Sequence, residues 1–238
     1  MYTKKLALTA LLMGLASWPV HAQVPYQTYV VRPAINNDAI LEDEPLPAVC
    51  RDETVMAIMA ARGEYEPASF LVKTDQPLEQ VMVRVDPLKG AAGTLPPEAV
   101  DVRIAQKFYR PITWQCVAMP WVLVHDPGML KIIDKHQKWV TEIAVENWDS
   151  PGGHSLEEYQ AGRSRMNQLT RELIDTEELQ PGDVQDFRQF WLTVHIPHDT
   201  PSGTYQATVT VSAKNAMTTK LTLEVTVPDF DLLPPKFE

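Results

Sequence analysis

Aromatic rings and carboxylates are the side chains of this sequence best suited to chemistry. Many of them fall in the interval from about residue 114 to residue 183. Four tryptophans lie there, at Trp114, Trp121, Trp139 and Trp148. Flat aromatic rings pack well against the apolar faces of sugars, and exposed rings on a secreted protein suit that role. The four tryptophans are therefore candidate glycan-binding residues, while burial in the core of the interval is the alternative for each of them.

Carboxylates near Trp148 suggest hydrolysis of glycosidic bonds as a second candidate chemistry. That reaction uses two carboxyl groups about 5 to 9 Å apart. The acidic residues close to it in sequence are Glu142, Glu146, Asp149, Glu157 and Glu158. With 31 acidic residues in the chain, however, such proximity is expected without any function. No catalytic residue is assigned on this basis.

Motifs for metals, phosphates and nucleophilic catalysis are missing from the sequence. His195 and His198 flank Pro197 without metal-ligand spacing, so we expect no metal and no cofactor. The two cysteines, Cys50 and Cys116, could form a disulfide in an oxidising compartment. Two buried thiols are the alternative, because only geometry can decide between the two states.

The first 22 residues have the pattern of a signal peptide. Lys4 and Lys5 precede the apolar run Leu6–Leu15, and Val20–Ala22 offers small residues for cleavage. The run is too short to cross a bilayer core of about 30 Å as a helix. The sequence therefore predicts an exported protein, periplasmic or extracellular, with no membrane span.

Charge and composition narrow the class of protein further. The formal net charge is −10, which argues against nucleic acid and anionic membrane surfaces as partners. Hydrophobic residues make up 45% of the chain, enough for a packed core. There are 20 prolines against 10 glycines, and frequent prolines interrupt helices while fitting turns and strand ends.

Alternating apolar and polar residues predict strands through most of the chain. The clearest pattern covers 204–212 and 218–227, two segments joined by a short polar break, which indicates an antiparallel hairpin. Further strands are expected at 28–32, 55–60, 69–74, 81–86, 100–107 and 190–196. Short strands with proline- and glycine-bearing turns predict a mainly β fold, an antiparallel β-sandwich of the immunoglobulin or galactose-binding type.

A Trp-rich, partly helical insertion is expected at about 114–183. Ser155 and Glu158 have the spacing of a capping box, which predicts a helix from Leu156 to about Ile174. The expected organisation is a signal peptide at 1–22, a β-sandwich at 23–228 that contains the insertion, and the start of an interdomain linker at 229–238. Trp191 alternates to the face opposite Phe190, and if both faces of that strand are covered we expect it in core or interdomain packing.

Several segments resemble one family. They are Phe190–Val194, Ile196–Pro197, Thr200–Tyr205, Val209–Val211, Ala61–Phe70 and Leu232–Pro235. They are similar to the N-terminal β-sandwich domain that precedes the catalytic barrel in glycoside hydrolases of the β-N-acetylgalactosaminidase type and their uncharacterised relatives. The resemblance covers about a quarter of the chain after the signal peptide. It implies an accessory domain that supports a hydrolase, or a free-standing relative of that domain. A glycan and a catalytic barrel domain following Glu238 are the candidate partners. No catalytic residue can be carried over, because the family's catalytic acids lie in that barrel.

Three functions follow as hypotheses. The first is a non-catalytic accessory domain that supports a glycoside hydrolase or contributes to glycan recognition. The second is a self-contained carbohydrate-active enzyme with its site in the Trp-rich insertion. The third is a periplasmic assembly or chaperone-like module that binds by strand addition and therefore needs an uncovered edge strand.

Overall fold

The computed structural model describes residues 23–35, 40, 45–112, 115–132, 141–143, 176–230 and 232. The predicted signal peptide and the predicted helix at 156–174 lie outside the described residues. So do three of the candidate tryptophans, namely Trp114, Trp139 and Trp148. Trp121 lies in a described strand, but its side chain is not among those described.

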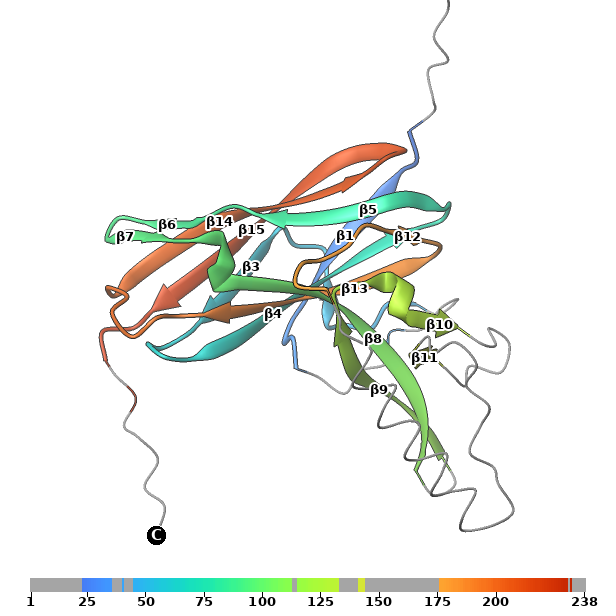
Figure 1. The fold of residues 1–238 in the computed structure, drawn as a ribbon, viewed down its shortest axis with the longest axis horizontal. Coiled ribbons are helices and arrows are strands. Elements are labelled where there is room, and N and C mark those ends of the chain that lie inside the picture. The colour runs from blue at the N-terminus through green and yellow to red at the C-terminus, as the bar shows by residue number, and fades with distance from the viewer. Residues whose placement is uncertain are drawn as a thin grey trace, which may run out of the picture.

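Two packed sheets form the body of the protein (Figure 1). Sheet A has the strand order β2-β1-β4-β13-β8-β9. The bounds of its strands in chain order are β1 Tyr26–Val31, β2 Cys50–Arg51, β4 Tyr65–Thr74, β8 Val100–Ile112, β9 Gln115–Val124 and β13 Phe187–His195.

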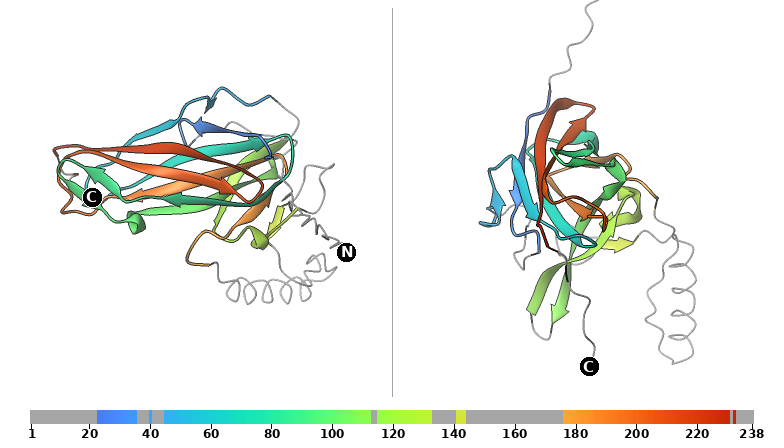
Figure 2. Two further views of the ribbon diagram at one scale, coloured as in Figure 1. Left: turned by 90° about the horizontal axis from the view of Figure 1, so that it is seen from above. Right: turned by 90° about the vertical axis from the view of Figure 1, so that its left-hand side faces the viewer.

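Sheet B has the strand order β12-β5-β14-β15-β3, with β6 and β7 attached beside β14. The bounds of its strands are β3 Val55–Met59, β5 Leu78–Val85, β6 Leu88–Gly90, β7 Gly93–Leu95, β12 Gly182–Val184, β14 Gly203–Ala213 and β15 Ala216–Val227. Two 3-10 turns, η1 Pro97–Ala99 and η2 Pro127–Met129, and a small sheet of β10 Leu130–Ile132 with β11 Thr141–Ile143 complete the described elements. Figure 2 shows the two layers from above and from one end.

The core lies between the two sheets and is built by every second residue of each strand. In β14 and β15, Tyr205, Val209, Leu223 and Val225 are all fully buried, while their immediate neighbours in each strand are at least partly exposed. From sheet A, Phe190 packs against Phe70 with ring centroids 5.2 Å apart. The strict alternation of the sequence therefore reflects one buried face per strand.

All the strands expected from the sequence are present, most of them longer than predicted. The hairpin of β14 and β15 is antiparallel and keeps its pairing from Gly203–Val227 to Ala213–Ala216. β4 begins at Tyr65 rather than at residue 69, because the whole segment pairs with β13. The β-sandwich class agrees with the structure.

One part of the sandwich prediction was wrong, because sheet B is not purely antiparallel. β3 runs parallel to β15, from Val55 opposite Thr222 to Met59 opposite Thr226. The sequence of β3, Val-Met-Ala-Ile-Met, is apolar on both faces and so carries no alternation that could set its direction.

The expected insertion begins within sheet A. β9 pairs with β8 over most of its length, whereas β13 pairs with β8 only as far as Ala105. Beyond that point β8 and β9 continue as a two-stranded arm that leaves the sandwich (Figure 1). Cys116 and Trp121 belong to this arm, and the predicted disulfide of Cys116 with Cys50 stays a prediction, because the Cys116 side chain is not described.

Candidate binding face on sheet A

The outer face of sheet A carries the most distinctive group of described side chains. Directly opposed residues of antiparallel strands share a face, so the strand registers define its rows. Tyr65 lies opposite His195, Pro67 and Asp101 flank Thr193, and Ser69 and Arg103 flank Trp191. We call this set the outer strip; its members are Tyr65, Pro67, Ser69, Trp191, Thr193, His195, Asp101 and Arg103.

At one end of the outer strip, Tyr65 stacks on His195. Their ring centroids are 4.3 Å apart and the planes differ by 14°. The stacked rings are not a core contact, because Tyr65 is 66% exposed. The pair therefore presents an aromatic surface to solvent.

A tight turn before β4 fixes the place of Tyr65. The Gly63 amide donates to the carbonyl of Ile196 at 2.7 Å, and the Ile196 amide donates to the carbonyl of Glu64 at 3.0 Å. Gly63 has a φ of +82°, a conformation that favours glycine. These bonds join the start of β4 to the end of β13, so that Tyr65 and His195 meet.

The carboxylate of Glu64 closes the same turn. Its Oε2 accepts a hydrogen bond from the backbone amide of Ala61 at 2.7 Å. The Arg62 side chain then donates to the carbonyl of Thr200 at 2.7 Å and reaches the carboxylate of Asp229 at 3.8 Å. Glu64 therefore has a structural role, which supports the Tyr65 end of the outer strip from below.

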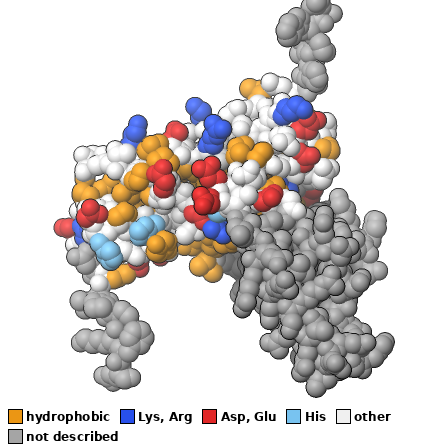
Figure 3. All heavy atoms as spheres, viewed as in Figure 1, with side chains coloured by type: hydrophobic (Ala, Val, Ile, Leu, Met, Phe, Trp, Pro, Cys, Tyr) orange, Lys and Arg blue, Asp and Glu red, His pale blue; other side chains and the backbone are white. Residues whose placement is uncertain are grey.

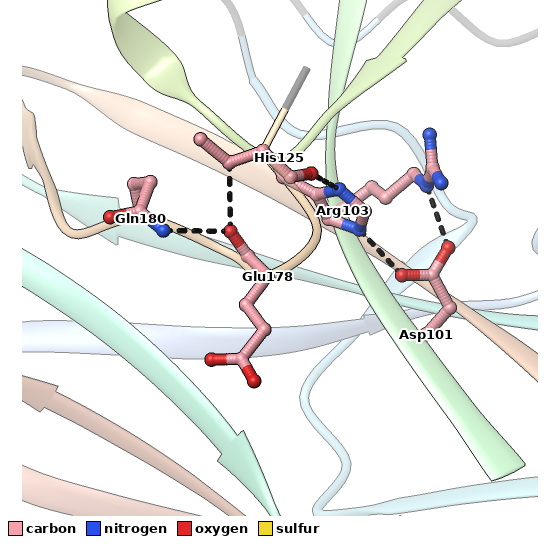
Figure 4. Close-up of polar contacts among 6 residues, drawn as sticks. Asp101, Arg103, His125, Glu178 and Gln180 are labelled. Atoms are coloured by element: carbon pink, nitrogen blue, oxygen red, sulfur yellow. Dashed lines mark hydrogen bonds and ion pairs between the residues drawn. The ribbon is translucent and has the colours of Figure 1, made fainter. Parts of the chain in front are cut away.

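A charged network occupies the middle of the outer strip (Figure 4). Asp101 accepts a hydrogen bond from Arg103 Nε at 2.6 Å, and its other oxygen lies 2.6 Å from His125 Nε2. Burial raises the pKa of Asp101, but the hydrogen bonds and positive charges of Arg103 and His125 outweigh burial and hold the pKa below its usual value of 3.8. Asp101 is therefore an anion at neutral pH.

His125 links this network to the segment at 176–180. Its Nδ1 lies 2.5 Å from the carbonyl of Thr176, and its own backbone carbonyl accepts a hydrogen bond from the Gln180 amide at 2.9 Å. Figure 4 shows the contacts continuing from Thr176 to Glu178 and Gln180. The ring of His125 is buried, so this cluster acts mainly as a structural latch between strand β9 and the segment before β12.

Two buried polar side chains lie farther along the same face. The Gln189 side chain donates to Ser69 Oγ at 2.8 Å, and Ser69 Oγ donates to the carbonyl of Phe190 at 2.8 Å. Trp191, beside them on β13, is half-buried and lies on the face opposite Phe190, as the alternation predicted. The outer strip thus grades from an exposed aromatic end to a more buried polar end.

Hydrophobic and charged side chains alternate over the visible face of the described surface (Figure 3). Figure 3 shows hydrophobic side chains interleaved with acidic ones, and histidine side chains near one end of the visible face. Among the described residues, no group of three or more His, Cys, Asp or Glu side chains could hold a metal ion. No helix in the described part of the chain is long and apolar enough to cross a membrane.

Sequence reasoning found some of these residues and missed others. It placed Trp191 on the face of its strand opposite Phe190, and this is confirmed. It missed Asp101, Arg103 and His125. The only signal available was that Asp101 and Arg103 are two residues apart in a predicted strand and therefore share a face.

Comparisons with known proteins give a remote likeness only. No protein-family model matches the chain, and no curated protein matches it. Among solved structures it is similar to a family 123 glycoside hydrolase from Clostridium perfringens, studied for glycolipid glycan hydrolysis, with a TM-score of 0.48 and 9% identity. The match covers 76% of this chain and 24% of the hydrolase, so the chain spans about a quarter of that protein's length. A likeness of this size carries no argument about activity.

Proposed function

We propose that this chain is an exported, non-catalytic accessory β-sandwich domain that recognises a glycan with the outer strip of sheet A. The observation that carries the proposal is the stacked pair of Tyr65 and His195. An exposed ring backed by a second ring is held rigidly and offers a flat apolar surface. Sugar rings bind to such surfaces through their apolar faces.

Polar groups next to the stacked pair would supply hydrogen bonds to sugar hydroxyls. The side chains of Asp101 and Arg103 are 39% and 35% exposed, so each keeps an accessible part. Arg103 donates to Asp101 through its Nε, and the side chain is partly exposed beside the stacked rings. Thr193 lies between Asp101 and Pro67 in the register and adds a hydroxyl to the same surface.

The non-catalytic assignment rests on the distribution of carboxylates. A described groove beside β3, discussed below, is lined by a single carboxylate, that of Glu66. Glycoside hydrolysis requires two. The four candidate tryptophans, Trp114, Trp121, Trp139 and Trp148, belong to the Trp-rich interval, as do the acidic residues near Trp148. Contact of these tryptophans with the glycan stays part of the proposal.

The proposed setting follows the sequence-based organisation. Residues 1–22 direct export, residues 23–228 form the sandwich, and residues 229–238 begin a linker toward a catalytic barrel domain. In that setting the accessory domain holds the glycan near the barrel and raises its local concentration there.

A glycan array with the protein that starts at Gln23, run alongside a hydrolysis assay on the bound glycans, tests this function. We expect binding to a subset of glycans without turnover. Turnover that survives purification and is lost on replacing acids near Trp148 would instead favour the self-contained enzyme. Absence of binding to every glycan, by a folded protein, contradicts the proposal.

A further inference from the structure

β3 is an edge strand whose outward backbone groups have no strand partner in the described part of the chain. It closes sheet B at the end of the order β12-β5-β14-β15-β3. The Thr222 amide donates to the carbonyl of Thr54, and the Ala60 amide donates to the carbonyl of Thr226. Even-numbered residues therefore bond to β15, and Val55, Ala57 and Met59 direct their N–H and C=O groups to the open side.

This edge lacks three of the usual protections of an edge strand, namely charged residues, proline and a bulge. Its sequence, Val-Met-Ala-Ile-Met, contains no charge and no proline, and its pairing with β15 runs without a bulge. Val55 is 40% exposed and Met59 is 63% exposed. Such an apolar edge offers a template for one more strand.

A groove of about 300 Å³ runs along the same edge. It lies between β3, the end of β1 with the residues after it, and the start of β4. Its lining residues on β3 are Met56 to Met59, and Ile35 on the opposite rim is 73% exposed. The groove contains one base, Arg32, and one acid, Glu66, so its charged lining groups balance. It therefore fits an uncharged, apolar occupant rather than a charged one.

The layering of the two sheets favours a lone strand over a second copy of the chain. β3 packs on β4, and sheet A continues past β4 with β1 and β2. In the left view of Figure 2 these blue strands lie along one flank of the sandwich. A second copy paired through its own β3 would bring its own β1 and β2 to the same side of the joined sheet, where the two sets would collide. An isolated segment has no such second layer.

We infer that the edge of β3 and its groove form a docking site for an extended, uncharged peptide segment with apolar side chains at alternate positions. The segment would add to sheet B beside β3, bonding through Val55, Ala57 and Met59. Side chains on its inward face would enter the groove, and methionines on β3 would adapt to their shapes. The groove borders the outer strip at Pro67 and Ser69, but peptide docking at β3 does not require glycan binding.

Selection of phage-displayed random nonapeptides on the folded protein tests the inference. We expect enriched sequences that alternate apolar and polar residues without charge. A synthetic peptide of an enriched sequence should slow amide hydrogen exchange at Val55, Ala57 and Met59. Enrichment of charged peptides, failure to enrich any, or protection elsewhere on the protein would overturn the inference.

Two variants locate the site. Ala57→Pro removes one outward amide without touching the bonds to β15, and it should abolish binding of the enriched peptide. Met59→Lys places a charge at the groove and should weaken binding at least about tenfold, a loss of about 1.4 kcal/mol. Met217→Lys, at a residue of β15 that is 68% exposed, is the matched control and should bind like the parent. If Met59→Lys and the control bind the enriched peptide equally, the peptide does not dock at β3. If the parent protein instead forms a dimer that Ala57→Pro disrupts, the edge of β3 pairs with a second copy of the chain, which also contradicts the inference.

Discussion

His125 Nε2 lies 2.6 Å from Asp101 Oδ1, which joins the residue after β9 to the second residue of β8. The other ring nitrogen faces the carbonyl of Thr176. Both ring nitrogens are therefore engaged by oxygen atoms. This cluster holds the His125 ring near the point where the chain returns from the Trp-rich interval to the sandwich.

Replacing His125 by alanine should lower the free energy of unfolding by about 1 to 3 kcal/mol, because it removes two hydrogen bonds at a buried site. Urea unfolding followed by fluorescence measures the change. Lys214→Ala, which removes an exposed ion pair with Glu79, is the control and should change the free energy by less than about 0.5 kcal/mol. Equal effects of the two substitutions would show that His125 is not a latch.

Asp101 should make stability sensitive to acid. Its pKa is lower in the folded state than in the unfolded chain, because Arg103 and His125 outweigh the effect of burial. A lowered carboxyl pKa contributes stability above the unfolded value of about 3.9 and loses it as the pH falls through the folded value. The stability difference between the parent and Asp101→Asn should thus be constant above about pH 5 and shrink toward pH 2.5. A difference independent of pH would contradict this assignment.

Gly63→Ala should destabilise the turn before β4 by about 1 to 2 kcal/mol, because the backbone has a φ of +82°. An added Cβ would also lie 2.4 Å from Cε1 of the His198 ring, but that exposed ring can move away. The same glycine substitution in a His198→Ala background separates the two causes. Most of the loss in unfolding free energy should persist there, whereas full recovery would assign the effect to the ring.

Tyr65→Ala should weaken glycan binding at least about tenfold while leaving the fold intact, since the lost ring is 66% exposed. Affinity for the best glycan of the array, measured by calorimetry, gives the loss. Met217→Ala removes a similarly exposed apolar side chain from β15 in sheet B and should bind like the parent. If both variants bind equally, the stacked pair is not part of the glycan site.

The sequence predicted the strands well because each core strand has one buried face and one solvated face. That pattern is local, and β14 and β15 show it over their full length. The outer strip could not be predicted in the same way. Tyr65 meets His195 only because β4 and β13, far apart in the chain, share a register, and no pattern within either strand contains that register.

The network around His125 was unpredictable for a related reason. His125 directly follows β9 and Thr176 lies near the end of the Trp-rich interval, so their contact depends on how that interval returns to the sandwich. The direction of β3 was also hidden, since an apolar run with no polar face fits a parallel or an antiparallel neighbour equally well.

The pairing of β3 with β15 also has a consequence for biosynthesis. β3 leaves the ribosome early, but its partner β15 is made only after all the intervening strands. At about 5 to 20 residues per second, translation of the intervening chain takes on the order of ten seconds or more. Throughout that time the five consecutive apolar residues of β3 lack their β15 partner, which leaves them accessible to chaperones.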